Sequence, residues 1–361
     1  MIGNQPKLLA SVILATFSLS LLTLHLAFLT KANAAPPGNP QDWQLTFTDE
    51  FDGNELNRAI WTTKYGYDTG RGDRTNNDDE REWYVDDAFN LQNEILSITT
   101  KSECLASVQR PDIYPPYNCT DFPYTSGIIT TQTSFTQKYG YFEIRMKVPP
   151  GVGFWPAFWL MPQMHDPVYW PPEIDIMENF GRNVNTIRFG HIYSPYYPNP
   201  AFGQWGGRHG MDYTDFGIDY SADYHLYSID WEPTGITWYI DNVPRFQNSE
   251  HLPPGTLTPG TMYILINLAV GGGLAQEPTP DTVFPNYLQI DYVRVYQKTA
   301  PTPQPTASPP PVTDLDGDND TDLRDLLQFL GFFGGTGQGD FNNSGRVDVF
   351  DFSLLVANFG R

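Results

Sequence analysis

Hydrophobic and polar residues alternate with a period of two in short runs over residues 43–297. Clear examples are YFEIRMKV, HLYSIDW, ITWYIDN, MYILINLAV and LQIDYVRVY, which begin at Tyr141, His225, Ile236, Met262 and Leu288. Because side chains alternate between the two faces of a β-strand, each run predicts a half-buried strand. Gly, Pro, Asn and Asp separate the runs, and no long helical period occurs among them. The pattern predicts an all-β domain in which two antiparallel sheets pack as a sandwich or jelly roll.

The pattern changes at both ends of this region. Lys7 precedes an apolar run at residues 8–29, and Ala32-Asn33-Ala34 follows it. These features predict a signal peptide over residues 1–34, cleaved after Ala34, and hence a secreted protein with no remaining membrane segment. The run is also long enough to be an uncleaved anchor.

The other end begins with a proline-rich stretch. PTPQPTASPPPVT, which starts at Pro301, contains six prolines and predicts an extended spacer rather than a packed core. We therefore expect a large domain at residues 35–298, a linker at residues 299–312 and a small module at residues 313–361.

The small module contains an internal repeat. DLDGDNDTDLRDLLQFLGFFG begins at Asp314, and DFNNSGRVDVFDFSLLVANFG begins at Asp340. Oxygen-bearing side chains occupy loop positions 1, 3, 5, 9 and 12 of each copy, namely Asp314, Asp316, Asp318, Asp322, Asp325, Asp340, Asn342, Ser344, Asp348 and Asp351. This spacing suits Ca²⁺, which takes six to eight oxygen ligands. We expect one Ca²⁺ in each loop and an apolar helix after it.

The repeat resembles the duplicated calcium loops of dockerin domains. The resemblance implies a cohesin-type protein partner. Loop positions 10 and 11 differ from those of enzyme-borne dockerins, which often have small hydroxyl residues there. This chain has Leu323, Arg324, Val349 and Phe350 instead. The module could therefore bind an unlike cohesin or only cap the chain.

Composition narrows the possible partners. The 361 residues carry a formal charge of −21, which argues against a nucleic-acid partner because phosphates would be repelled. Aromatic residues make up 15% of the chain, which suits the stacking of sugar rings as well as a β-core. Only Cys104 and Cys119 are present. Export favours a disulfide between them, and two free thiols are the alternative.

The segment WPPEIDIMEN, from Trp170, contains the candidate chemistry. In a regular strand Glu173 and Asp175 share one face, and Glu178 points to the other. A single β-bulge at Ile176–Met177 would return Glu178 to the acid face and leave the apolar residues in the core. Two carboxyls could then approach the ~5 Å separation of a retaining glycosidase. One would attack the anomeric carbon, and the other would protonate the leaving oxygen.

EIDIME resembles the catalytic motif of glycoside hydrolase family 16. The resemblance extends to four other segments: FTDEFDG from Phe47, GFWPAFWLMP from Gly153, INLAVGGG from Ile266 and IDYVRVY from Ile290. It implies a concanavalin-like jelly roll with a sugar-binding cleft and retaining endo-hydrolysis. By position, Glu173 is the expected nucleophile, Asp175 the assisting acid and Glu178 the general acid/base.

The resemblance also implies further site residues. Trp155, Trp159 and His191 are expected to line the cleft, although core roles are the alternative for one tryptophan and for the histidine. Glu82 and Trp83 are expected beside the donor subsites. A structural Ca²⁺ is expected at Asp291 and near Glu50.

Other positions leave the substrate open. Ile128 stands where laminarinases usually have Arg, and this departure favours the bacterial exopolysaccharide-type members of the family. A β-1,3- or β-1,3(4)-glucan is the first hypothesis, and a bacterial exopolysaccharide or marine galactan is the alternative. A non-catalytic carbohydrate-binding sandwich would lack the acid pair, and both glutamates are present. A metal on the three acids would lack the His or Cys ligands that often accompany one.

Overall fold

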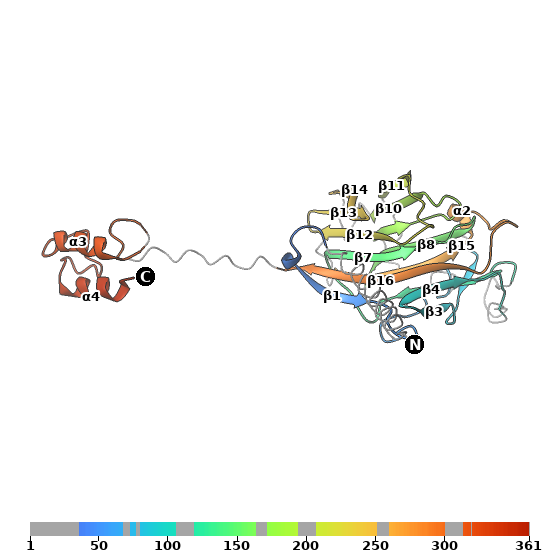
Figure 1. Cartoon of the computed structure of the whole chain (residues 1–361), viewed down its shortest axis with the longest axis horizontal. Helices are drawn as coiled ribbons and strands as arrows, with labels where there is room; N and C mark the ends of the chain where they lie inside the picture. The colour runs from blue at the N-terminus through green and yellow to red at the C-terminus, as the bar shows by residue number, and fades with distance from the viewer. Residues whose placement is uncertain are drawn as a thin grey trace, which may run out of the picture. The chain divides into compact units, whose positions relative to one another are not determined.

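The computed structural model describes residues 36–67, 73–76, 80–105, 119–163, 172–193, 207–250, 260–299, 313–318 and 320–360. The chain divides into two compact units, residues 1–299 and residues 300–361 (Figure 1). The expected signal peptide, and all but the first residue of the expected linker, lie outside the described residues. No described helix is long and apolar enough to cross a membrane.

The larger unit consists mainly of two antiparallel sheets (Figure 1), as the alternating pattern predicts. The eight-stranded sheet contains β1 (Trp43–Asp49), β3 (Phe89–Gln92), β4 (Ile95–Thr100), β7 (Gly140–Lys147), β12 (His225–Glu232), β13 (Gly235–Ile240), β14 (Val243–Asn248) and β16 (Asn286–Lys298). Its order is β14-β13-β12-β7-β16-β4-β3, and β1 also pairs with β16.

The six-stranded sheet has the order β11-β10-β9-β8-β15-β6. Its strands are β6 (Ile128–Thr130), β8 (Phe154–Pro162), β9 (Glu173–Glu178), β10 (Thr186–Tyr193), β11 (Gly207–Asp215) and β15 (Met262–Val270). The smaller elements of this unit are β2 (Glu82–Tyr84), β5 (Tyr124–Ser126), the 3₁₀ turn η2 (Pro40–Asp42) and the short helix α2 (Gly272–Ala275). β2 and β5 form a parallel pair.

The core lies between the two large sheets. Alternate residues of β7, Phe142, Ile144 and Met146, pack in one cluster with Phe158 and Leu160 of β8. All five side chains are fully buried. The apolar half of each alternating run therefore faces the opposite sheet, and the sequence pattern follows from a sandwich with one buried face on each sheet.

β9 contains the expected bulge. Phe158 and Trp159 are adjacent on β8, but they pair with Met177 and Asp175, so Ile176 has no opposite residue on that strand. Ile174, Ile176 and Met177 all belong to the core cluster. One extra residue thus restores the face of Glu178 while three apolar side chains stay buried.

A buried tryptophan of the facing sheet holds the bulged strand. Nε1 of Trp238, on β13, donates a hydrogen bond to the backbone oxygen of Asp175 at 2.8 Å. This hydrogen bond crosses the core and holds the backbone of β9 at Asp175, immediately before the bulge.

The smaller unit has two helices, α3 (Leu323–Phe332) and α4 (Val349–Asn358). Phe329, Val347 and Leu355 are fully buried at its centre. Each helix is followed by a glycine with positive φ, Gly334 at 85° and Gly360 at 78°, a conformation that suits helix termination. The predicted loop-then-helix repeat is therefore present. In the larger unit, Cys104 and Cys119 form the expected disulfide.

The Trp238 hydrogen bond can be tested with a matched control. Trp238→Phe leaves a buried carbonyl without its donor, so the free energy of unfolding should fall by about 1–3 kcal/mol. Trp231 is the control, because it is equally buried in the same cluster and its indole N–H has no hydrogen-bond partner among the described residues. Urea denaturation followed by tryptophan fluorescence would compare the two variants. Equal losses for Trp238→Phe and Trp231→Phe would contradict the anchoring role.

Candidate active site

The three predicted acids lie together on the face of the six-stranded sheet that points away from the core. We call this the acid face, defined by Glu173, Asp175 and Glu178. The register on β10 places Ile192, Gly190 and Arg188 opposite these acids in that order. Asp175 and Glu178 are each only 4% exposed, whereas Glu173 is partly exposed. The spacing in the sequence therefore predicted their common face correctly.

Nitrogen donors surround the buried end of the acid face. Oε1 of Glu178 accepts hydrogen bonds from Trp155 Nε1 and from Arg188 Nη1, each at 3.1 Å. Arg208 Nε lies 3.7 Å from Asp175 Oδ2, and its Nη2 lies 3.9 Å from Glu178 Oε2. Asp212 accepts hydrogen bonds from both arginines. The acids thus form one charged network with two strands beyond their own.

Burial changes the protonation of these acids. Desolvation, reinforced by the charge of Asp175, raises the pKa of Glu178 to about 7, against the opposing effect of Arg188 and Arg208. Desolvation and the nearby Glu173 hold the pKa of Asp175 well above its usual value. Glu178 can therefore carry a proton near neutral pH, which is the property that a general acid needs.

The two predicted cleft tryptophans both lie on the acid face. Trp155 contacts Glu178 directly, as described above. Trp159 pairs with Asp175 across the strands, and its Nε1 donates to Asn267 Oδ1 at 2.9 Å. Both rings are largely buried, at 8% and 7% exposure. They support the face that carries the acids, and each retains a small exposed edge.

The three other predicted contacts are all buried. His191 pairs with Ile174, whose side chain is in the core, so it lies on the opposite face from the acids and is fully buried. Glu82 is also fully buried, and its Oε2 accepts a hydrogen bond from the backbone of Val270. Trp83 packs against Phe122 in a separate small cluster. His191 thus has the core position that was the alternative, because a local motif match does not show which way a strand face points. Glu82 and Trp83 lie on β2, where the Tyr84 hydroxyl accepts a hydrogen bond from Asn267, the partner of Trp159 on the acid face.

Sequence reasoning missed the two arginines. Arg188 lies three residues before His191, on the strand that follows the catalytic motif, and it occurs at the same face as Gly190 and Ile192. Arg188 alternates along the strand with the apolar Phe189, and this alternation could have placed Arg188 on the acid face. Arg208 is two strands from β9, and nothing in its neighbouring residues indicates that it reaches the acids.

Comparison with known proteins agrees with this site. Residues 76–292 match the sequence profile of glycosyl hydrolases family 16. The chain belongs to this family. It is 32% identical over 267 residues to endo-1,3-1,4-beta-glycanase EglC of Rhizobium meliloti, covering 71% of this chain and 52% of that protein. It is 33% identical over 296 residues to glucan endo-1,3-beta-glucosidase A1 of Niallia circulans, covering 72% and 39%. The chain thus spans about half the length or less of these relatives.

A solved structure is similar to the larger unit. The laminarinase catalytic domain from Thermotoga maritima is 31% identical, with a TM-score of 0.59, over 72% of this chain and 100% of that domain. The family profile covers both β9 and the strands that supply Trp155, Arg188 and Arg208. The glycosidase fold and the acid motif therefore belong to the larger unit alone.

The structural calcium expected at Asp291 and near Glu50 stays a prediction, and both of these side chains have arginine partners. Arg294 donates to both carboxylate oxygens of Glu50, at 2.7 and 3.0 Å. Arg145 donates to Asp291. Each of the two carboxylates is thus paired with a guanidinium, so an ion at this place would have to share Asp291 with Arg145.

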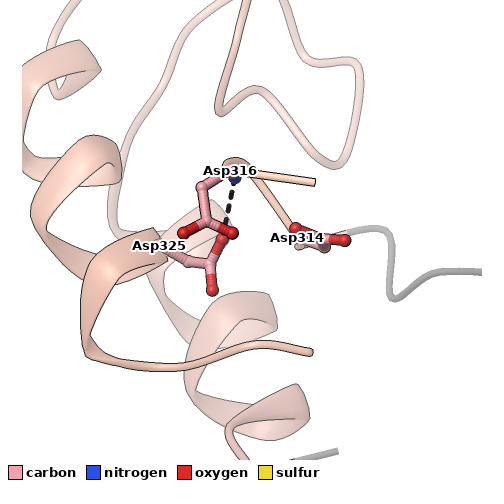
Figure 2. A group of neighbouring side chains, drawn as sticks. All are labelled: Asp314, Asp316 and Asp325. Atoms are coloured by element: carbon pink, nitrogen blue, oxygen red, sulfur yellow. Dashed lines mark hydrogen bonds between the residues drawn. The ribbon is translucent and has the colours of Figure 1, made fainter. Parts of the chain in front are cut away.

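The first loop of the smaller unit does gather carboxylates. Asp314, Asp316 and Asp325 bring one oxygen each to within 4.8 Å of one another. Figure 2 shows the Asp316 and Asp325 side chains next to each other, with Asp314 to one side. Asp320, Asp322 and Asp325 form an overlapping group. All of these donors are hard oxygens, which suits Ca²⁺. Asp318, the predicted position 5 ligand, lies outside both groups and pairs with Arg324.

The second loop is organised by backbone contacts. Asp340 accepts hydrogen bonds from the backbone N–H groups of Ser344 and Gly345, and Asn342 also accepts one from Ser344. Asp348 and Asp351 form a capping box at the start of α4, as Asp322 and Asp325 do at α3. The position 12 aspartate is thus a helix cap in both loops.

Glu82 offers a test of charge burial in the larger unit. Desolvation raises its pKa from 4.5 to about 7, so the folded state holds this proton more tightly than the unfolded state. Stability should therefore be lost as pH rises from about 4.5 to about 7. Glu82→Gln does not titrate and can still accept from Val270. Its free energy of unfolding should exceed that of the natural chain at pH 8 by on the order of 1–3 kcal/mol.

Urea denaturation at pH 4.5 and pH 8 would measure this difference. All nine tryptophans precede residue 299, so their fluorescence reports the larger unit. Glu103→Gln, a change at a glutamate whose side chain is 38% exposed, is the control. A Glu82→Gln effect of the same size at both pH values would argue against the raised pKa.

Proposed function

We propose that this protein is a secreted, retaining endo-glycosidase that hydrolyses a β-1,3- or β-1,3(4)-linked glucan. The observation that carries the proposal is the pairing of Glu173 with a buried Glu178 of near-neutral pKa on one strand face. The names of the relatives, an endo-1,3-1,4-beta-glycanase, a glucan endo-1,3-beta-glucosidase and a laminarinase, support the substrate class. Secretion rests on the signal-like residues 1–34.

The acids have separate roles in this proposal. Glu173, the most exposed of the three, attacks the anomeric carbon as a carboxylate. Glu178 transfers its proton to the glycosidic oxygen as the bond to that oxygen breaks. Asp175 interacts by a hydrogen bond with Glu173, and its raised pKa lets it supply that proton. Glu178, now a carboxylate, then removes a proton from the water that releases the sugar from Glu173.

The nucleophile can be assigned by removing it. Glu173→Gln should lower kcat on laminarin or lichenan by at least about 1,000-fold, because no carboxylate remains to form the glycosyl-enzyme. Reducing-end release is the measurement. The exposed Glu55→Gln should keep full activity. With Glu173→Ala, added azide should give the glycosyl azide of inverted anomeric configuration. Normal hydrolysis by Glu173→Gln would contradict the assignment.

For the smaller unit, we propose two Ca²⁺ sites and a cohesin-type partner. The oxygen donors of both loops support the ions. The residues at loop positions 10 and 11 support a protein contact, because Leu323, Val349 and Phe350 are between 57% and 68% exposed despite being apolar. These side chains would contact an apolar surface on the partner.

Calorimetric titration of the whole chain with Ca²⁺ tests the ion sites. We expect two equivalents in the natural chain and one in either Asp325→Asn or Asp351→Asn, since each variant removes the last carboxylate of one loop. The double variant should bind neither loop ion. An equivalent that persists in the double variant would place an ion outside the two loops.

A further inference from the structure

Arg188 occupies a position that bears directly on Glu178. It lies opposite Glu178 on the neighbouring strand, and its Nη1 donates to Oε1 of that carboxyl at 3.1 Å. Its Nε donates in the other direction to Asp212 at 2.9 Å. The guanidinium therefore has two fixed contacts, and its side chain is only 18% exposed.

Arg208 closes the same network from β11. It donates to Asp212, and its side chain is 9% exposed. Its guanidinium passes over Gly190, where a Cβ atom would lie only 3.0 Å from Arg208 Cζ and Nε. Glycine at position 190 thus leaves the space that lets Arg208 reach Asp175 and Glu178.

The two oxygens of Glu178 are consequently unequal. Oε1 accepts N–H groups from both Trp155 and Arg188, so it is a poor site for a proton. Oε2 is buried and has no hydrogen-bond partner among the described residues, and Arg208 Nη2 lies 3.9 Å from it, beyond hydrogen-bond distance. The neutral carboxylic acid is therefore best accommodated with its hydrogen on Oε2.

We propose that Arg188 is a positioning residue for the general acid: with Trp155 it holds Oε1 of Glu178, leaves the transferable proton on Oε2, and is itself held by Asp212. The role of Glu178 as proton donor rests on the proposed function. In the glycosylation step the Oε2–H bond breaks, its proton moves to the glycosidic oxygen, and that oxygen leaves with the bonding electrons. The negative charge that develops on Glu178 is then stabilised by the guanidinium of Arg188.

The charges around Glu178 determine the direction of a pH effect. Asp175 and Glu173 share its own strand, Arg188 faces it from β10, and Arg208 and Asp212 face it from β11. β8 contributes the uncharged indole of Trp155. Loss of the Arg188 charge should raise the pKa of Glu178, so the carboxyl should keep its proton to a higher pH.

Trp155 allows Glu178 to be observed without an activity assay. Its indole N–H donates to Glu178, so the ¹⁵N–¹H resonance of Trp155 should shift as that carboxyl ionises. In protein with ¹⁵N-labelled tryptophan, assigned by comparison with Trp155→Phe, we expect a titration midpoint near pH 7 for the natural chain. Arg188→Met and Arg188→Gln should raise the midpoint by at least about one pH unit. Arg188→Lys should keep it within about half a unit.

The kinetic measurements separate positioning from substrate binding. In Arg188→Met we expect kcat to fall about tenfold or more with KM changed less than about threefold, and the alkaline limb of the kcat profile should move upward with the midpoint. Lys101→Met removes the same charge at a remote ion pair with Glu103 and should leave both the midpoint and the kinetics unchanged.

The outcomes distinguish this inference from the proposed function. An unchanged midpoint in folded Arg188→Met and Arg188→Gln would overturn the role of Arg188, even if the natural chain hydrolyses glucan. A natural chain that hydrolyses no glucan would overturn the proposed function, while the Trp155 titration would still decide whether Arg188 holds Glu178. The titrations begin near pH 5. Glu178 is neutral at that pH, so the variants without the Arg188 charge do not have to fold around an unpaired buried carboxylate.

Discussion

The bulge at Ile176 is the constraint on which the site depends. A strand of regular pleat would direct Glu178 into the core with Ile174, at the cost of burying a carboxyl among apolar side chains. One unpaired residue removes this conflict, because it places two apolar residues in succession on the core side. The Trp238 hydrogen bond to Asp175 then fixes the backbone immediately before the bulge. The acid face and the core are thus produced by the same irregularity.

Burial of the acids has an electrostatic consequence. Desolvation raises the pKa of Glu178 to about 7, and the neighbouring Asp175 adds to that shift. The two arginines act in the opposite direction, and they come from strands that follow β9 in the sheet. The net effect is a carboxyl that holds its proton near neutrality but has a cation beside it when the proton leaves. Neither burial nor charge pairing alone would give both properties.

Short-range patterns predicted much of this architecture from the sequence. Alternation identified the strands, and the spacing of Glu173, Asp175 and Glu178 was sufficient to predict the bulge, because both are properties of one strand. The positions of His191 and Glu82 depend on how a strand face is oriented against its neighbours, which a local motif does not specify. The pairing of Glu50 with Arg294 and of Asp291 with Arg145 joins residues far apart in the chain or on separate strands. Such pairings appear only when the sheet register is known.

The smaller unit uses its acids in a different way. Burial of Asp325 would by itself raise its pKa, but backbone N–H groups of Asp322, Leu315 and Asp316 outweigh that effect and lower it. The carboxylate therefore stays charged while it closes the loop onto the start of α3. Asp325 is also the member shared by both carboxylate groups of the first loop, where the proposed ion would bind. Because Asp351 has the same cap and a similarly lowered pKa, the duplication has conserved a loop-closing carboxylate at position 12 in both copies, whereas the exposed acids of the two loops differ. Helix capping and the proposed ion binding therefore involve the same residue.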